Sequence, residues 1–237
     1  MSPLDQRGSS PTGTIQERLK NIHHRIVEAA GKSGRSPEAI GLVAVTKKVG
    51  LAQIQEALSL GIRDIAESRI QEAEEKWSGL KSQSVTHHFI GHLQTNKAKR
   101  AAQLFDLIQS IDSPKLAVAL DRTSTEAGKK QRCLIEVKVS TEQTKTGVPL
   151  SEASQFIQSF DQYKNLQLDG LMMMAPHLLP PDATRACFGS FKKFFDSEKK
   201  YFGERMILSM GMSDDFEIAV EEGSTLVRVG RALFGER

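Results

Sequence analysis

A lysine pair closes the first apolar run of the chain. The stretch "LVAVTKK" covers residues 42–48 and has the pattern of a buried strand that ends in two amines. Side chains alternate along a strand, so Val43, Val45 and Lys47 would share one face, and Lys48 would point away from it. If that face lines a barrel, Lys47 points into its mouth. Withdrawal from water lowers the pKa of an amine and leaves it able to form a Schiff base with a carbonyl compound.

The alternative for this stretch is a pair of solvated lysines at a strand end, since lysine is mostly exposed. The C-terminal third of the chain favours the first interpretation. The stretch "LSMGMSDDFEIAVEEGSTLVRVGRALFGER" contains two strand ends, each followed by a small or glycine-containing turn and then by a helical segment. Backbone N–H groups at such turns bind phosphate, helped by the positive end of the helix that follows.

The expected phosphate site takes donors from both turns. They are the Ser209 hydroxyl, the Met210–Gly211–Met212 backbone, and the amides of Gly230 and Arg231. The alternative is that these glycines only mark ordinary loop boundaries. A nucleophilic amine facing a phosphate site favours pyridoxal 5′-phosphate (PLP), whose aldehyde and phosphate lie at opposite ends of a flat ring. A Schiff-base aldolase that acts on a phosphorylated sugar would use the same two features and stays open.

These groups need strands that end at a common edge. Short apolar or β-branched runs recur along the chain as "IGLVAV", "RDIAE", "HHFIG", "LFDLIQS", "RCLIEVKV", "LQLDGLMM", "RMILSM" and "TLVRVG". Most intervening segments have a helical pattern, such as 114–130, where Ser113 is a cap and Pro114 lies in the first turn. The alternation indicates a parallel sheet covered by helices. Eight units favour an α/β fold of one closed (β/α)8 TIM barrel over an open doubly wound sheet.

An extra helix is expected before the barrel. Thr14 and Glu17 have capping-box spacing, and an apolar face follows them. Residues 1–13 are rich in Ser, Pro and Gly, which predicts a flexible tail. No linker divides the remainder, so residues 14–237 are expected to form one barrel domain.

Bulk composition excludes several classes of function. The 32 basic and 29 acidic residues are too evenly mixed to indicate a nucleic-acid partner. Two cysteines suggest neither a disulfide framework nor a thiolate metal site, and His87, His88 and His92 lack further ligands at metal spacing. No apolar run approaches the ~20 residues of a membrane span, and no signal peptide is evident, so a cytoplasmic protein is expected.

Five stretches resemble successive blocks of one known family. They are "LVAVTKK", "AESRIQEAEEKW", "HHFIGHLQTNKAK", "DGLMMMAP" and the C-terminal stretch quoted above. From about Ile15 onward the chain resembles the YggS/PROSC family, the pyridoxal phosphate homeostasis proteins. The resemblance implies a barrel like the N-terminal domain of alanine racemase, which holds PLP as a Schiff base without an established catalytic reaction. The implied role is control of vitamin B6 and of amino and keto acid pools.

The resemblance also implies roles for individual residues. Lys47 corresponds to the Schiff-base lysine, and Arg228 to the arginine directed at the cofactor ring. The phosphate-binding positions are Ser209, Gly211, Gly230 and Arg231. Three positions depart from the family pattern: Ser68 replaces an amide side chain, Met173 a frequent Thr or Cys, and Val49 a frequent lysine.

The main alternative is a PLP-dependent amino-acid racemase. An arginine that faces the pyridine nitrogen discourages protonation there and makes the ring a weaker electron sink. A racemase would also need a second base opposite Lys47, and Tyr163 and Tyr201 are expected at the far end of the barrel. No catalytic residue is therefore assigned. PLP-dependent apo-enzymes are candidate partners, and a monomer is expected because no apolar helix face is left over.

Overall fold

Eight parallel strands form a closed ring in the computed structural model, which describes residues 13–80, 84–139, 146–176 and 179–236. The ring strands are β1 (Gly41–Val45), β2 (Asp64–Glu67), β3 (Thr86–Phe89), β4 (Leu107–Ile111), β5 (Gln131–Lys138), β7 (Leu166–Met172), β8 (Ile207–Ser209) and β9 (Leu226–Val229). Their order is β4-β3-β2-β1-β9-β8-β7-β5, and β5 pairs back with β4 to close the ring. Each of the eight predicted runs overlaps one of these strands. The predicted TIM barrel is confirmed.

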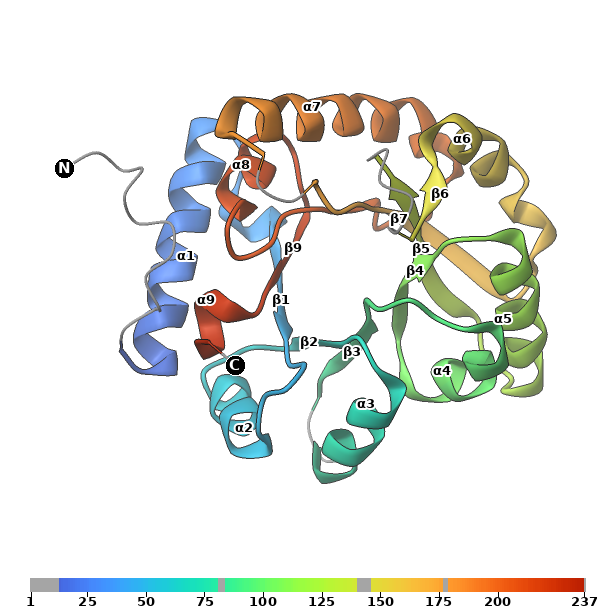
Figure 1. Ribbon diagram of the computed structural model, residues 1–237, viewed down its shortest axis with the longest axis horizontal. Helices are drawn as coiled ribbons and strands as arrows, with labels where there is room; N and C mark the ends of the chain where they lie inside the picture. Colours follow the sequence, from blue (N-terminus) through green and yellow to red (C-terminus); the bar gives the residue numbers. More distant parts are fainter. Residues whose placement is uncertain (1–12, 81–83, 140–145, 177–178, 237) are drawn as a thin grey trace.

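Helices surround this ring (Figure 1). The α-helices are α1 (Ile15–Lys32), α2 (Leu51–Ser59), α3 (Ile70–Trp77), α4 (Ala98–Leu104), α5 (Pro114–Glu126), α6 (Leu150–Gln158), α7 (Pro181–Glu198), α8 (Phe216–Glu221) and α9 (Arg231–Phe234). Short 3-10 turns are η2 (Pro37–Ala39), η3 (Ser78–Leu80), η4 (Thr95–Lys97), η5 (Phe160–Gln162) and η6 (Lys199–Tyr201). The two-residue strand β6 (Val148–Pro149) pairs with the end of β5. No helix in the described ranges combines the length and apolarity that a membrane crossing needs.

Both faces of the barrel wall are buried, as a parallel sheet requires. Outward-facing residues such as Ala44, Ile65 and Ile108 join the large core beneath the helices. The residues that alternate with them form two smaller apolar clusters inside the ring. One cluster contains Val43, Ala66 and Leu226, and the other contains Leu107, Leu134 and Met172. The barrel is therefore filled with side chains, and its chemistry is confined to the strand ends and to the polar groups among these clusters.

The predicted N-terminal helix is present as α1, which packs outside the ring against α8 and α9. Thr14 and Glu17 form the predicted capping box: the Glu17 N–H donates to the Thr14 hydroxyl at 3.2 Å, and the Thr14 N–H donates to the Glu17 carboxylate at 2.8 Å. Ile15, Leu19 and Ile22 lie on its buried face. Of the predicted flexible tail, residues 1–12 lie outside the described residues.

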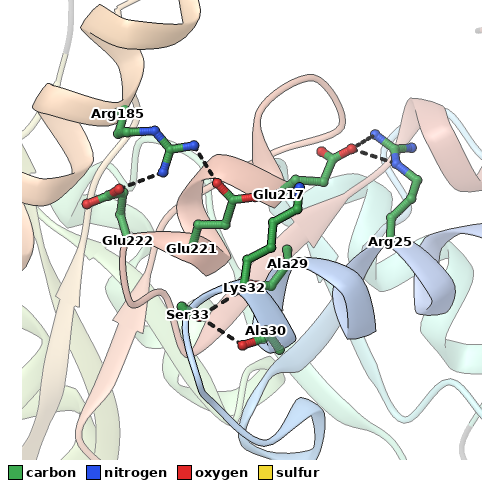
Figure 2. Close-up of polar contacts among 9 residues, drawn as sticks. All are labelled: Arg25, Ala29, Ala30, Lys32, Ser33, Arg185, Glu217, Glu221 and Glu222. Atoms are coloured by element: carbon green, nitrogen blue, oxygen red, sulfur yellow. Dashed lines mark hydrogen bonds and ion pairs between the residues drawn. The ribbon is translucent and has the colours of Figure 1, made fainter. Parts of the chain in front are cut away.

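Ion pairs join α1 to α8 (Figure 2). Arg25 donates to Glu217 at 2.7 Å, and Lys32 donates to Glu221 at 3.1 Å. Arg185 of α7 binds the same Glu221 and also Glu222, so three helices meet at this acidic stretch. Because α8 connects β8 to β9, the contacts of α1 support the part of the barrel that carries the two predicted turns.

Candidate functional site

The predicted amine, Lys47, lies in a turn directly after β1. The strand ends at Val45, and the Thr46 N–H still donates to the Ala66 carbonyl at 2.9 Å. Beyond that bond the chain turns, with Lys48 at φ 58°, and both lysines are exposed. The expected withdrawal of Lys47 from water is therefore wrong, because the strand alternation stops before it reaches this residue. An exposed amine at the edge of the barrel is accessible to an aldehyde that enters from solvent.

Residues 46–48, called here the lysine turn, are held from beneath by β2 and α3. The buried Thr46 hydroxyl donates to Glu67 Oε1 at 2.8 Å. Lys76 Nζ donates to the Thr46 carbonyl and to Glu67 Oε1, each at 2.8 Å. Glu72 accepts from the Lys48 N–H at 2.9 Å and from Lys76 at 3.1 Å. Burial raises the pKa of Glu67, so Lys76 supplies the positive charge that offsets the burial of this carboxylate.

The two predicted phosphate-binding turns follow β8 and β9, and residues 210–215 and 230–232 are called here the phosphate cup. The Ser213 hydroxyl accepts from the Gly230 N–H at 3.3 Å and from the Ala232 N–H at 3.2 Å. Two backbone donors thus converge on a single oxygen, which is the arrangement that binds an anionic oxygen. The hydroxyl oxygen stands in for a phosphate oxygen at this point, so the residues present fit a phosphate group. Ser213 is not among the predicted site residues, although its place in "GMS", beside the predicted donor Met212, is a local signal for this role.

Other predicted members of the cup have different contacts. Gly211 has φ 93°, and its carbonyl accepts from the Arg228 N–H at 3.0 Å, which joins the turn after β8 to strand β9. Met210 is buried in the core beneath the helices. Arg231 is exposed, and its guanidinium pairs with Asp214.

The Ser209 side chain lies inside the barrel and is fully buried. Its hydroxyl donates to Gln109 Oε1 at 2.7 Å and accepts from Arg228 Nη1 at 2.5 Å. In this structure Ser213, rather than Ser209, supplies the hydroxyl next to the cup amides. The difference follows from strand alternation, which turns Ser209 at the end of β8 toward the interior.

Arg228 is buried inside the barrel between these groups. Its Nη2 donates to the Met173 carbonyl at 2.9 Å. Burial lowers the pKa of Arg228 to about 10, while the carboxylates of Asp215 and Glu136 favour its charged form. The Met173 side chain belongs to the outer core, so the departure at this position leaves the backbone contact intact. Of the other departures, Val49 packs in the same core, and Ser68 is half-buried directly after β2.

The lysine turn and the phosphate cup lie at the same edge of the barrel, although the turn ends at residue 48 and the cup begins only at residue 210. Strand β9 is hydrogen-bonded to β1 on one side and to β8 on the other, with Ala44 in register with Val229. Neighbouring strands are about 4.8 Å apart, so one small molecule can contact the ends of all three. Closure of the barrel therefore brings the predicted amine, the cup and Arg228 together.

The three candidate histidines lie in separate environments. His87 packs against the ring of Trp77, with centroids 4.2 Å apart. His88 is buried inside the barrel, and His92 Nδ1 lies 3.0 Å from Asp112 Oδ2 at the edge of an open cavity of about 500 Å³. Among the described residues, no three His, Cys, Asp or Glu side chains form a group that could hold a metal ion.

Comparison with known proteins assigns the family. A family model described as "Alanine racemase, N-terminal domain" matches residues 18–237. A protein of Aquifex aeolicus named "Pyridoxal phosphate homeostasis protein" is 36% identical over 222 residues, which are 93% of this chain and 97% of that protein. The chain belongs to the pyridoxal phosphate homeostasis protein family.

Other members of the pyridoxal phosphate homeostasis protein family agree with this assignment. A Synechocystis protein of the same name is 38% identical over 203 residues, which are 85% of this chain and 93% of that protein. Among solved structures, PipY of Synechococcus elongatus, described "with PLP bound", superposes with a TM-score of 0.83 at 34% identity and covers 94% of this chain and 100% of its own. The resemblance to the YggS/PROSC family is confirmed.

Proposed function

We propose that this protein binds PLP covalently through the Lys47 amine and acts in PLP homeostasis and in amino and keto acid balance. The observation that carries the proposal is the lysine turn on β1 beside the phosphate cup on β9 and β8. These places suit the two reactive ends of one PLP molecule. The bound PLP described for PipY, a structure 34% identical to this chain, supports the same cofactor.

Each group of the site has a separate task in this proposal. The Lys47 amine reacts with the PLP aldehyde, and a phosphate oxygen takes the place of the Ser213 hydroxyl oxygen on the amides of Gly230 and Ala232. Arg228 is assigned to the ring nitrogen, where a permanent cation disfavours protonation of the ring. PLP supplies an electron sink for amino-acid chemistry, and this arginine weakens it. The chain's residues are therefore better suited to retaining the cofactor than to using it.

Racemisation is the less favoured function. It would require a second base across the ring from Lys47. Tyr163 directly precedes β7, and Tyr201 precedes β8, so both lie by the amino ends of the strands, opposite the proposed site. Solvent-deuterium exchange at the α-carbon of an amino acid would reveal such an activity.

The remaining properties are part of the same proposal. The PLP-binding domain would span residues 14–237. The protein would be cytoplasmic and monomeric. PLP-dependent apo-enzymes are the proposed recipients of the cofactor, because PLP that the protein holds without using it in catalysis can be passed on. Activation of an apo-enzyme by the loaded protein, compared with an equal amount of free PLP, tests the transfer.

Borohydride trapping and the visible spectrum test the covalent link. The purified protein is expected to absorb in the visible range and, after reduction, to carry the mass of reduced PLP on the peptide that contains Lys47. Lys47→Ala should abolish both signals. Lys48→Asn is the matched control, because Asn tolerates the positive φ of this position and removes the neighbouring amine. Label on Lys48, or retention of both signals in Lys47→Ala, would contradict the proposal.

A further inference from the structure

The interior of the barrel contains one continuous chain of hydrogen-bonded side chains. Its members in order are Arg228, Ser209, Gln109, His88 and Asp64. The four successive distances are 2.5 Å, 2.7 Å, 2.8 Å and 2.9 Å. The first four side chains are at most 3% exposed, and only Asp64 is partly accessible to solvent.

This chain crosses the barrel. Gln109 lies on β4 and Ser209 on β8, and β5 and β7 separate these strands on the shorter way around the ring. Their hydrogen bond can form only through the interior. Asp64 opens β2, whereas Ser209 is the last residue of β8, so the chain also runs from the amino ends of the strands toward the edge that carries the phosphate cup.

The donors and acceptors at the two ends give the hydrogen bonds of this side-chain network one direction. Arginine only donates and a carboxylate only accepts. The Ser209 hydroxyl accepts from Arg228 and donates to the Gln109 carbonyl oxygen. The Gln109 amide nitrogen then donates to His88 Nδ1, which leaves the Nε2–H of His88 to donate to Asp64. Each bond satisfies the next group, so removal of one member leaves buried polar atoms without partners.

The position of the Arg228 guanidinium depends on this network of hydrogen-bonded side chains. The guanidinium has two described hydrogen bonds, one to the Met173 carbonyl and one to the Ser209 hydroxyl. The Met173 carbonyl is held by the backbone of β7, but the Ser209 hydroxyl can rotate. Gln109 fixes that rotation because it requires the hydroxyl hydrogen for itself, and His88 fixes the orientation of the Gln109 amide.

We propose that Gln109 and His88 are positioning residues that hold the Arg228 guanidinium against the cofactor ring from within the barrel. The inference rests on the proposed function and deepens it. The protonation of the PLP ring would depend on two residues that lie inside the barrel, away from the phosphate cup. The nearby carboxylates of Glu136 and Asp215 favour the charge of Arg228, whereas this chain sets its direction.

Two pairs of matched variants test the inference. Gln109→Met is compared with Gln131→Met, because both glutamines are fully buried and hydrogen-bonded. Gln131 donates to the carbonyls of Phe105, Asp106 and Arg132 and so lies outside the network that reaches Arg228. His88→Leu is compared with His87→Leu, its neighbour on the outer face of β3. Purified proteins are loaded with PLP, and their visible spectra, PLP dissociation constants and unfolding midpoints are measured.

Both variants of each pair should lose stability, but only Gln109→Met and His88→Leu should shift the visible absorption maximum. PLP binding to these two should weaken about tenfold, the effect of one lost hydrogen bond to a charged group. His88→Asn keeps an acceptor for the Gln109 amide and should restore the spectrum toward wild type. The His88 pair decides the question if Gln109→Met does not fold.

Failure of the inference is distinguishable from failure of the proposed function. If wild-type protein shows no visible band after loading, PLP binding itself is refuted. If the band forms and the spectra of Gln109→Met and His88→Leu match those of their controls, the positioning role is overturned while PLP binding stands. Failure of His88→Asn to restore a spectrum that His88→Leu has shifted also counts against the ordered chain.

Discussion

Three ionisable side chains of the site are withdrawn, in whole or in part, from water. Arg228 and Glu136 lie inside one end of the barrel, and Asp215 lies in the phosphate cup near them. Burial lowers the pKa of Arg228 and raises those of Glu136 and Asp215, which favours the neutral form of each group. The guanidinium remains charged at neutral pH even with a pKa of about 10. The site therefore presents a fixed cation to any ring bound above it.

Glu136 makes stability depend on pH. It is 3% exposed, its Oε1 accepts from the Thr146 hydroxyl at 3.0 Å, and burial raises the pKa of its carboxyl. The folded protein thus binds more protons than the unfolded chain above about pH 4.3, the ordinary pKa of glutamate. The stability that Glu136 contributes is fully present below that pH and is lost as pH rises through the folded pKa. Glu136→Gln removes this dependence and keeps an acceptor for Thr146.

Urea unfolding of both proteins across pH 4 to 8 measures the effect of Glu136. The amide variant should be the more stable protein at neutral pH, and the two should converge as the pH falls toward the ordinary pKa of glutamate. A difference that stays constant with pH would refute the assigned cause.

Gly211 is limited by both conformation and space. Its φ is 93°, and a Cβ there would lie 2.5 Å from Ala219 Cβ and 2.9 Å from Phe216 Cα. Gly34 is the matched control, with φ 65° and no atom within 4 Å of an added Cβ. Gly34→Ala should cost about 1–2 kcal/mol of unfolding free energy, and Gly211→Ala about 3 kcal/mol or more with weaker PLP retention. Equal losses of stability would show that the space around Gly211 does not matter.

At the scale of elements, helix α3 supports the lysine turn from outside the barrel. Lys76 lies under the turn, in contact with the Thr46 carbonyl and with Glu67, whose side chain is fully buried. The helix thus takes part in the site without contributing a residue to its surface. Substitution of Lys76 should change the site through the turn.

Lys76→Met should cost about 3–5 kcal/mol at neutral pH, because it leaves the Glu67 carboxylate buried without its cation. The loss should shrink as pH falls and Glu67 takes up a proton. The double variant Lys76→Met/Glu67→Gln removes both charges and should recover part of the stability. Denaturant unfolding of the wild type, Lys76→Met, Glu67→Gln and the double variant provides the coupling energy between the two side chains. Additive losses would mean that the two side chains do not depend on each other.

The elements were more predictable from the sequence than the directions of side chains at their ends. The apolar runs of the barrel strands are strong signals because both faces of a parallel sheet are buried. The exposure of Lys47 was missed because alternation extends only as far as the strand, and β1 ends at Val45. The partners of Ser209 could not be predicted either, since its contact with Gln109 joins strands that are not neighbours. Ser213, in contrast, had a local signal that could have been used.

At the scale of the whole molecule, α1 joins the first part of the chain to its last helices. Its apolar face packs on the same side of the barrel as α8 and α9, which follow the strands of the phosphate cup. The ion pairs at its surface lie between partly exposed side chains, so most of the stability of this contact should come from apolar burial.

Ile22 and Arg25 separate these two contributions. Ile22 is 1% exposed, so Ile22→Ala should cost about 2–4 kcal/mol. Arg25 pairs with Glu217 and lies 4.4 Å from the ring centroid of Phe216, but it is partly solvated, so Arg25→Ala should cost about 1 kcal/mol or less. Chemical denaturation ranks the two variants, and the reverse order would show that the ionic contacts hold α1 in place.

Pairing of β1 with β9 joins two strands that are translated far apart in time, since Ala44 lies in register with Val229. A nascent chain that has displayed its lysines still lacks the proposed phosphate donors until β8, β9 and the turns after them have been translated. On the proposed function, capture of the cofactor would have to wait for β9, and truncated products that lack this strand would be unable to retain PLP.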